Sequence, residues 1–274
     1  MPNIIVNREL CVKCHLCSSI CVMGIIRPEA DTGYPTISPA NEASCMRCGH
    51  CEAFCPQRAL VLDFLTDERQ AFAEGENTID PRRLSLYMRG RRSIRYFKPE
   101  AVSRETITRI LEITRYAPTG GNSQSVQWLV IHDRAEVQRV ASLTVDWMRS
   151  IQGTPHPLAP YVAHIITAWD QGLDLVCRKA PHLVFAHIPY VEFVDDRTDA
   201  IIAISHFDIA APAFGVGACW AGFIQMALGS WPPLLDALAL PEKRSIGYGL
   251  FFGYPSHPVM AIPRRNELVV QWRG

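Results

Sequence analysis

Eight cysteines near the start of this 274-residue chain are the residues whose spacing most clearly predicts chemistry. They form two runs with the same spacing, C-x2-C-x2-C-x3-C, and a proline follows the second run. This spacing is typical of bacterial proteins that hold two cubane iron–sulfur clusters, in which the fourth cysteine of each run binds the other run's cluster. The predicted ligands are Cys11, Cys14, Cys17 and Cys55 for one [4Fe–4S] cluster, and Cys45, Cys48, Cys51 and Cys21 for the other.

Two other uses of such cysteines fit the pattern less well. A disulfide framework requires an oxidising compartment, and zinc sites usually take their ligands in pairs, not as a triplet plus one. One position departs from the motif, since Val22 stands where a proline would follow the first run.

An arginine-rich segment, Arg89-Gly90-Arg91-Arg92-Ser93-Ile94-Arg95, is the second candidate site. A basic run is usually a solvated face. Arginines beside a serine also suit a phosphate group, because guanidinium groups bind phosphate through forked, charge-assisted hydrogen bonds.

A polar loop at 117–124, with the sequence APTGGNSQ, follows about 25 residues later. It joins a predicted helix to a predicted strand and could be an ordinary turn. In the alternative interpretation, Asn122 and Gln124 hydrogen-bond the edge of a ring or a ribityl chain.

The elements that must position these residues divide the chain into two domains. Residues 1–63 contain the cysteine runs, flanked by short strands at Ile4–Val6 and Leu60–Phe64, and the two halves resemble each other as an internal repeat. Residues 64–80 are polar and read as a linker, and residues 28–40 as a Pro/Gly-rich connection. Residues 81–274 form the second domain, whose mixed helices and strands predict an α+β class.

The expected elements of the second domain start with a helix capped by Asp80 and ended by Gly90, and a helix from Ser103 to about Tyr116. Buried strands are expected at 127–132, 182–187 and 247–252, and helices at 135–149, 161–178, 199–214 and 221–239. Gly215-Val216-Gly217 follows a helix and lacks the third glycine of a dinucleotide fingerprint, so a Rossmann nicotinamide site is not expected.

Composition excludes several classes of protein. The formal net charge is zero, which argues against a nucleic-acid partner. Eight of the ten cysteines lie in the first 55 residues, which favours a metal module in a reducing cytoplasm. Residues 1–10 lack the features of a signal peptide. The apolar stretch Ile209–Leu228 is long enough for a membrane span, but we expect a buried helix pair there.

Several conspicuous residues are given structural roles. His182, His187, His206 and His257 lack metal-ligand spacing. Cys177 and Cys219 are single thiols of the kind that is commonly buried. The remaining expectations are core or dimer contacts for Trp147, Trp169, Trp220 and Trp231, and surface or capping roles for Asp170 and Asp174.

Five segments of the second domain, taken in order, resemble the nitroreductase-like flavoprotein family. They are RRSIRYF (91–97), APTGGNSQ (117–124), GVGACWAG (215–222), GYP (253–255) and IPRRNELVVQW (262–272). The whole chain resembles the branch of that family with a fused N-terminal ferredoxin domain that holds two [4Fe–4S] clusters. The resemblance implies a bacterial-type ferredoxin fold, then a nitroreductase-like α+β sandwich that forms a homodimer of the domain-swapped type.

The resemblance also implies FMN at the dimer interface. It assigns the phosphate and ribityl chain to Arg91, Arg92, Ser93, Arg95 and Arg265, with Arg264 as an alternative to Arg265. It assigns other flavin contacts to Pro118, Thr119, Asn122 and Gln124, and it places the backbone of Trp220, Ala221 and Gly222 beside the reactive flavin nitrogen. Many relatives have a proline after the Asn-x-Gln, where this chain has Ser125-Val126.

The implied function is an FMN-dependent oxidoreductase, with the chemistry on the flavin and no catalytic side chain. Clusters carry single electrons, whereas a flavin collects two and transfers a hydride to a small acceptor, such as a nitroaromatic or a quinone. The electron donor is external: a ferredoxin, a reductase or a nicotinamide. Alternative reactions on the same scaffold are dehalogenation, enone reduction and flavin cleavage. An alternative function from a different class of protein is that of a redox sensor or electron carrier without a small substrate.

Overall fold

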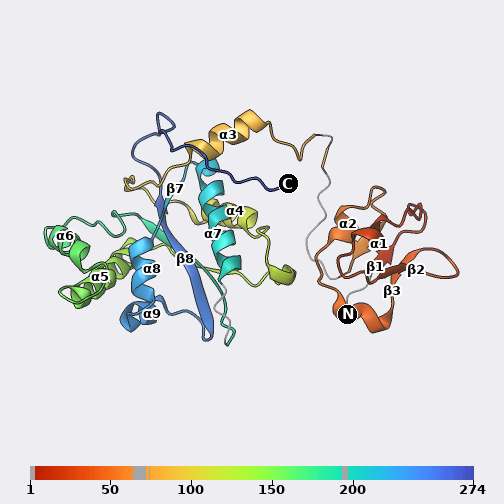
Figure 1. Cartoon of the computed structure of the whole chain (residues 1–274), viewed down its shortest axis with the longest axis horizontal. Coiled ribbons are helices and arrows are strands. Elements are labelled where there is room, and N and C mark those ends of the chain that lie inside the picture. Colours follow the sequence, from red (N-terminus) through yellow and green to blue (C-terminus); the bar gives the residue numbers. More distant parts are fainter. Residues whose placement is uncertain (1–3, 64–71, 74, 193–196) are drawn as a thin grey trace. The chain divides into compact units, whose positions relative to one another are not determined.

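The computed structural model describes residues 4–63, 72–73, 75–192 and 197–274. The chain divides into two compact units, one of residues 1–78 with 119–123, the other of residues 79–118 with 124–274 (Figure 1). The predicted domain limits, 1–63 and 81–274 with a linker at 64–80, stay a prediction, and much of that linker lies outside the described residues.

The first unit is built from two antiparallel strand pairs and short helices. Strand β1 (Ile4–Val6) pairs with β4 (Leu60–Leu62), and β2 (Ile26–Pro28) pairs with β3 (Pro35–Ile37). The connecting elements are α1 (Leu16–Ile20), the 3-10 helix η1 (Pro39–Ser44) and α2 (His50–Ala53). The β2–β3 hairpin occupies a region in which the sequence predicted only a connection. Phe64, the predicted end of β4, lies outside the described residues.

The second unit is organised around one antiparallel sheet with the strand order β5-β6-β8-β7. Its strands are β5 (Gln127–Ile131), β6 (His182–Pro189), β7 (Gly217–Trp220) and β8 (Arg244–Gly253). Its helices are α3 (Pro81–Gly90), α4 (Arg104–Thr114), α5 (Arg134–Ile151), α6 (Ala159–Asp170), α7 (Thr198–Ala210), α8 (Gly222–Leu228) and α9 (Pro232–Leu238), with 3-10 helices η2 (Gly120–Asn122) and η3 (Ala211–Phe214).

Helices lie on both sides of this sheet (Figure 1). Leu183 and Phe185 of β6 belong to a core that includes residues of α5, α6, α8 and α9. The alternate residues Val184 and Ala186 belong to a second core, with residues of α4 and α7. Successive strand residues point to opposite faces, so β6 is buried on both sides, and the predicted α+β sandwich is confirmed.

Two helix starts follow the predicted capping chemistry. Asp80 accepts a hydrogen bond from the Arg83 N–H (2.8 Å), and Ser103 accepts one from the Thr106 N–H (3.1 Å). Each cap satisfies one of the N–H groups that the first turn of a helix leaves unpaired. The first of these helices, α3, ends at Gly90 as expected and carries the arginine-rich segment at its C-terminus.

Three predicted helices differ from the observed ones: the helix predicted for 199–214 ends at Ala210, and two others differ more. The helix predicted for 161–178 ends at Asp170, and Gly172 then takes a left-handed φ of 81° that no helix accommodates. Asp174 follows as a buried carboxylate that accepts the N–H groups of Val176, Cys177 and Lys179 in a turn. The helix predicted for 221–239 is divided into α8 and α9, and α9 starts at Pro232.

The apolar stretch Ile209–Leu228 is not the helix pair that we expected. It contains the end of α7, the 3-10 helix η3, strand β7 and all of α8. Pro212 removes a backbone donor where α7 would continue. In the described part of the chain, no helix has both the length and the apolar character that a membrane crossing requires.

Candidate cluster and flavin sites

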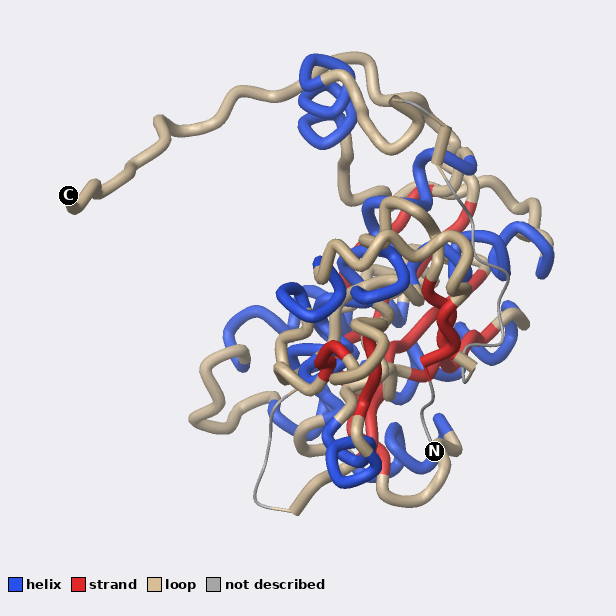
Figure 2. Tube along the Cα trace, turned by 90° about the vertical axis from the view of Figure 1, so that its right-hand side faces the viewer, coloured by secondary structure: helices blue, strands red, loops and turns tan. Residues whose placement is uncertain are grey.

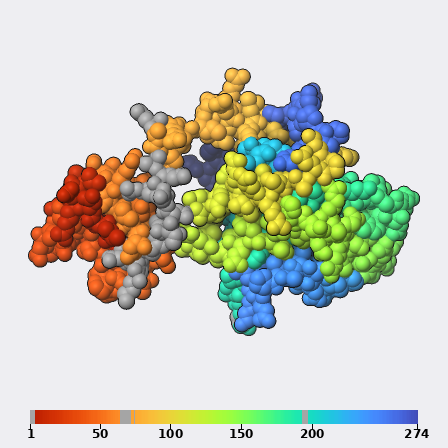
Figure 3. All heavy atoms as spheres, turned by 180° about the vertical axis from the view of Figure 1, so that it is seen from behind, coloured from red at the N-terminus to blue at the C-terminus, as the bar shows by residue number. Residues whose placement is uncertain are grey.

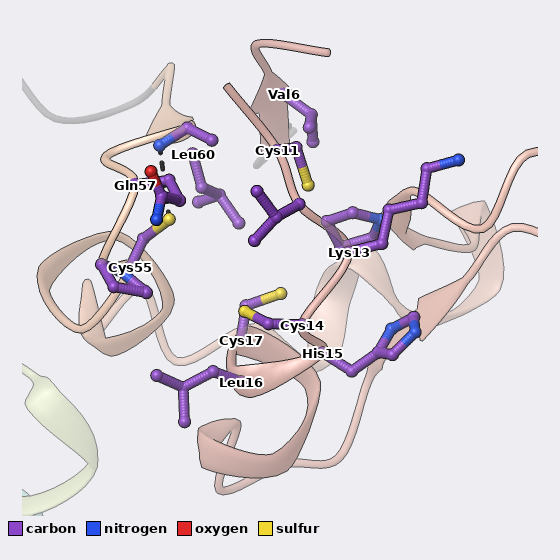
Figure 4. Close-up of a pocket in the computed structure, with 14 residues that line it drawn as sticks. Val6, Cys11, Lys13, Cys14, His15, Leu16, Cys17, Cys55, Gln57 and Leu60 are labelled. Atoms are coloured by element: carbon purple, nitrogen blue, oxygen red, sulfur yellow. Dashed lines mark hydrogen bonds between the residues drawn. The ribbon is translucent and has the colours of Figure 1, made fainter. Parts of the chain in front are cut away.

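The first unit gathers the cysteines around two hollows. One is lined by Cys11, Cys14, Cys17 and Cys55, and their side chains surround a common space (Figure 4). The other hollow is lined by Cys21, Cys45, Cys48 and Cys51. Each hollow therefore combines three cysteines of one run with the fourth of the other, which is the grouping that the spacing predicts.

Both cysteine loops follow the same backbone path. Lys13 and Arg47, which precede the second cysteine of each run, both have φ of 54°. His15 and Gly49, which follow that cysteine, have φ of 59° and 75°. Non-glycine residues with such angles carry strain of about 1–3 kcal/mol each, so the loops hold an unfavourable conformation that turns successive thiols to one side.

The donor set suits an iron–sulfur cluster. All ten cysteines are free thiols, which excludes a disulfide framework in this structure. Within the described ranges, no three His, Cys, Asp or Glu side chains are placed to hold a single metal ion. Four soft sulfur ligands spread around a hollow fit a cubane better than one zinc ion, which draws its ligands to a point.

Burial affects two of these thiols. It raises the pKa of Cys17, and it raises the pKa of Cys51 to about 11. Metal binding requires thiolates and therefore releases these protons. The Ala59 N–H donates a hydrogen bond to Sγ of Cys55 (3.3 Å).

In the second unit, the arginine-rich segment lies against strand β7. The Ile94 N–H donates to the carbonyl oxygen of Ala218 (2.9 Å). The Ile94 side chain fills the space beside Gly217, where a Cβ would lie 2.5 Å from Ile94 Cγ1. The predicted phosphate-binding segment is thus fixed to the strand that leads into Trp220, Ala221 and Gly222.

A buried carboxylate provides a further connection. Oδ2 of Asp208, on α7, lies 3.2 Å from Nη1 of Arg91 and accepts a hydrogen bond from Nε1 of Trp220 (3.0 Å). Trp220 also packs edge-on against Tyr248, with ring centroids 4.8 Å apart. Arg91 and Trp220, predicted to contact different parts of one ligand, therefore share a partner.

Other donors of the segment are available for an anion. Arg92 donates from Nη2 to the carbonyl oxygen of Arg89 (2.8 Å), while its buried Nε has no hydrogen-bond partner in the described residues. A buried donor without an acceptor is costly. A phosphate oxygen would satisfy this Nε, so the segment fits the phosphate group of FMN.

The thiol of Cys219, on β7, is affected by side chains of the arginine-rich segment. Burial raises the pKa of the Cys219 thiol, and Asp208 adds to this effect, while Arg95, a hydrogen bond with Ser93 and Arg178 oppose it. Cys219 is 4% exposed, in keeping with the predicted structural role.

The predicted contacts of the loop are divided between the two units. Residues 119–123 group with the first unit, whereas Pro118 and Gln124 group with the second. Asn122 and Gln124 have left-handed φ values of 53° and 48°, so the loop is tightly turned.

At the other predicted contacts, the Ala221 N–H donates to the carbonyl oxygen of Gly249 (2.9 Å), and Gly222 begins α8. Arg264 and Arg265 lie on an exposed C-terminal segment that extends away from the sheet (Figure 2).

Sequence reasoning missed two residues of this site, Asp208 and Arg178. Asp208 carried a usable signal, because it is the single acidic residue within the apolar part of its helix and buried carboxylates require partners. Arg178 carried no such signal in the sequence. It was assigned to a predicted helix, whereas it has φ of 57° in the turn before β6.

Two family models match this chain. A family model described as "Nitroreductase family" matches residues 88–254, and one described as "4Fe-4S dicluster domain" matches residues 10–60. A protein of Archaeoglobus fulgidus, provisionally named NADH dehydrogenase/NAD(P)H nitroreductase, is 26% identical over 166 residues. The match covers 60% of this chain and 81% of that protein.

Two solved nitroreductases with bound FMN share the fold. The one from Desulfitobacterium hafniense has a TM-score of 0.55 and 19% identity, covering 68% of this chain and 97% of that one. The one from Bacteroides fragilis has a TM-score of 0.51 and 17% identity, covering 68% and 94%. With the family model matching most of the chain, this protein belongs to the nitroreductase family of flavin-dependent oxidoreductases and carries an N-terminal 4Fe–4S dicluster domain.

Proposed function

We propose that this chain binds FMN on its arginine-rich segment, and that the N-terminal module supplies electrons for reduction of a small organic acceptor of the nitroaromatic or quinone type. The observation that carries the proposal is the buried Nε of Arg92, which lacks a partner among the described residues. It lies in a segment fixed against β7, beside Arg91 and Ser93. An anionic group with several oxygens is the ligand that this donor set suits.

The chain's own residues have three tasks in this proposal. Arg91, Arg92, Ser93 and Arg95 bind the phosphate. The backbone that follows β7 positions the ring, and the two cysteine loops hold two [4Fe–4S] clusters, which pass one electron at a time. Bound FMN supplies the conversion of single electrons into hydride transfer.

We further propose that the working form is a homodimer with FMN at the interface. Helix α3 has no buried residue, and its Leu84, Leu86 and Met88 are 42%, 52% and 44% exposed. Figure 3 shows this helix standing out from the surface of its unit. In the C-terminal segment, Leu268, Val269 and Trp272 are 88%, 92% and 88% exposed.

Apolar side chains that contact so little of their own chain indicate a partner surface, and a second copy would bring Arg265 to the phosphate. Sedimentation of the full-length protein should give twice the mass of one chain, and removal of residues 262–274 should give a monomer that retains less FMN. A full-length monomer with tightly bound FMN would contradict the dimer proposal.

The composition of the purified protein tests the proposed function. Anaerobic purification followed by iron, sulfide and flavin assays should give roughly eight irons, as two cubanes require, and one FMN per chain. The same sample, given an external reductant, should reduce a nitroaromatic compound steadily. Iron without FMN would contradict the enzyme and would favour an electron carrier.

A further inference from the structure

Asp208 occupies a position where a carboxylate is unfavourable by itself. Its side chain is 8% exposed and lies near the C-terminal end of α7. Burial disfavours the charged form of a carboxylate, and the negative end of a helix repels it. Nothing in the packing of α7 against the apolar core requires an acid at this point, so the residue must be explained by the partners that it holds.

Those partners come from the two segments that the proposed function places on FMN. Nη1 of Arg91 lies 3.2 Å from Oδ2 and 3.5 Å from Oδ1, and Nε1 of Trp220 donates to Oδ2 at 3.0 Å. Arg91 is the residue that follows α3, and Trp220 is the last residue of β7. One carboxylate thus fixes the phosphate side and the ring side of the proposed site relative to each other.

The contact leaves Arg91 able to bind a second anion. A guanidinium group has five N–H donors in a planar fork, and the contacts with Asp208 involve Nη1 alone. The Arg91 side chain is 29% exposed, so its remaining donors can reach a ligand. A charge-assisted contact on one nitrogen therefore orients the plane of the others.

We propose that Asp208 is the positioning residue that orients Arg91 toward the FMN phosphate, an inference that rests on the proposed function. Asp208 makes no contact with the flavin itself in this account. It acts through Arg91, and the contact with Trp220 holds the carboxylate in place for that purpose. Loss of its charge alone, with the hydrogen bond from Trp220 retained, should therefore weaken the recognition of the phosphate and leave the recognition of the ring unchanged.

Riboflavin, which lacks the phosphate, separates these two effects. Full-length protein with intact clusters is freed of flavin, and FMN and riboflavin are titrated into wild type and Asp208→Asn by flavin fluorescence. The amide keeps the shape of the side chain and an acceptor for Trp220 but loses the charge that holds Arg91. We expect FMN binding to weaken about tenfold, the worth of one charge-assisted hydrogen bond, and riboflavin binding to stay unchanged.

Asp174→Asn is the matched control. Asp174 is also a buried carboxylate, but it accepts three backbone N–H groups in the turn before β6. Its substitution should lower the thermal stability and leave the ratio of FMN to riboflavin affinity at the wild-type value. A general effect of removing a buried charge would instead appear in both variants.

Arg91→Lys provides a second route if Asp208→Asn folds poorly. Lysine keeps the charge but cannot form the fork, so it should lose the same preference for FMN. Combining the two substitutions should cost no more than Arg91→Lys alone, because both remove one interaction.

Four outcomes would overturn the proposal. Equal weakening of FMN and riboflavin by Asp208→Asn would show a structural role only. Tighter FMN binding would show that Asp208 merely neutralises Arg91. Absence of FMN binding by the wild-type chain would remove the proposed function and this inference together, whereas wild-type binding with no effect of Asp208→Asn would remove this inference alone.

Discussion

The side chain of Ile94 occupies the space that a β-carbon on Gly217 would need. The added atom would lie 2.5 Å from Cγ1 and 2.8 Å from Cβ of Ile94, and 3.0 Å from Cγ of Pro255. Non-bonded carbon atoms prefer separations of about 3.5–4.0 Å. The absence of a side chain at position 217 therefore allows the arginine-rich segment to approach β7 as closely as it does.

Gly217→Ala should displace Ile94 and the arginines on either side of it. We expect a loss of about 1–3 kcal/mol in the free energy of unfolding, as for other overpacked sites, together with faster loss of FMN. Thermal unfolding and flavin retention on a desalting column measure the two effects. Gly229→Ala is the control, because its β-carbon would have an ordinary contact of 3.5 Å with the carbonyl oxygen of Met226. Retention of FMN by Gly217→Ala at the wild-type level would contradict the importance of this contact.

The crossed cysteine assignment predicts which substitutions act on one cluster. Cys21→Ser should remove about half of the iron, since it leaves one of two cubanes with three thiolates. Adding Cys48→Ser should remove little more, because both residues line the same hollow. Adding Cys14→Ser should remove nearly all the remaining iron, because Cys14 lines the other hollow. Iron assays that gave the reverse pattern would show that each run holds its own cluster.

Because of the buried His182, we expect the second unit to lose stability at acidic pH. The ring is fully buried; its Nε2 accepts the Val102 N–H (2.9 Å), and its Nδ1 donates to the carbonyl oxygen of His132 (3.0 Å). Burial is the largest cause and the neighbouring His132 the second, and they lower the pKa of His182 from 6.5 to about 4. Between these values the unfolded chain binds more protons, so stability falls as the pH falls from 6.5 toward 4, by up to about 3 kcal/mol.

Urea unfolding followed by tryptophan fluorescence across this pH range measures the effect. His182→Gln keeps a donor and an acceptor without titrating, so it should flatten the dependence on pH. His257→Gln, at an exposed position, should keep the wild-type slope. An unchanged slope in His182→Gln would assign the acid sensitivity to other groups.

The sequence predicts the local features of this protein better than the distant ones. The cysteine hollows were predictable because three ligands of each lie within seven residues, and the repeat supplies the fourth. The capping residues Asp80 and Ser103 act on their own helices and were also predictable. Asp208 was missed because its partner Arg91 is 117 positions away, and no local pattern records such a pairing.

Strand β7 shows a second reason for failure. Gly217–Trp220 is a short, apolar run, and such a run cannot be told from a buried helix by its periodicity. Its pairing with β8 decides its conformation. The division of α8 from α9 was more accessible, since Pro232 and Pro233 mark the first turn of a new helix.

The most direct test of the whole account follows the clusters while an acceptor takes their electrons. Wild type and Arg92→Ala, both reduced anaerobically, are mixed with a nitroaromatic compound, and cluster absorbance is followed in time. Arg92→Ala should retain less FMN, because it loses the buried Nε donor of the segment, while its cluster absorbance stays unchanged. Arg139→Ala, at an exposed position on α5, is the control and should behave as wild type.

We expect rapid cluster reoxidation in wild type, slow reoxidation in FMN-depleted Arg92→Ala, and recovery when excess FMN is added. Equal rates with and without FMN would contradict the proposed route through FMN, because the clusters would then reduce the acceptor by themselves.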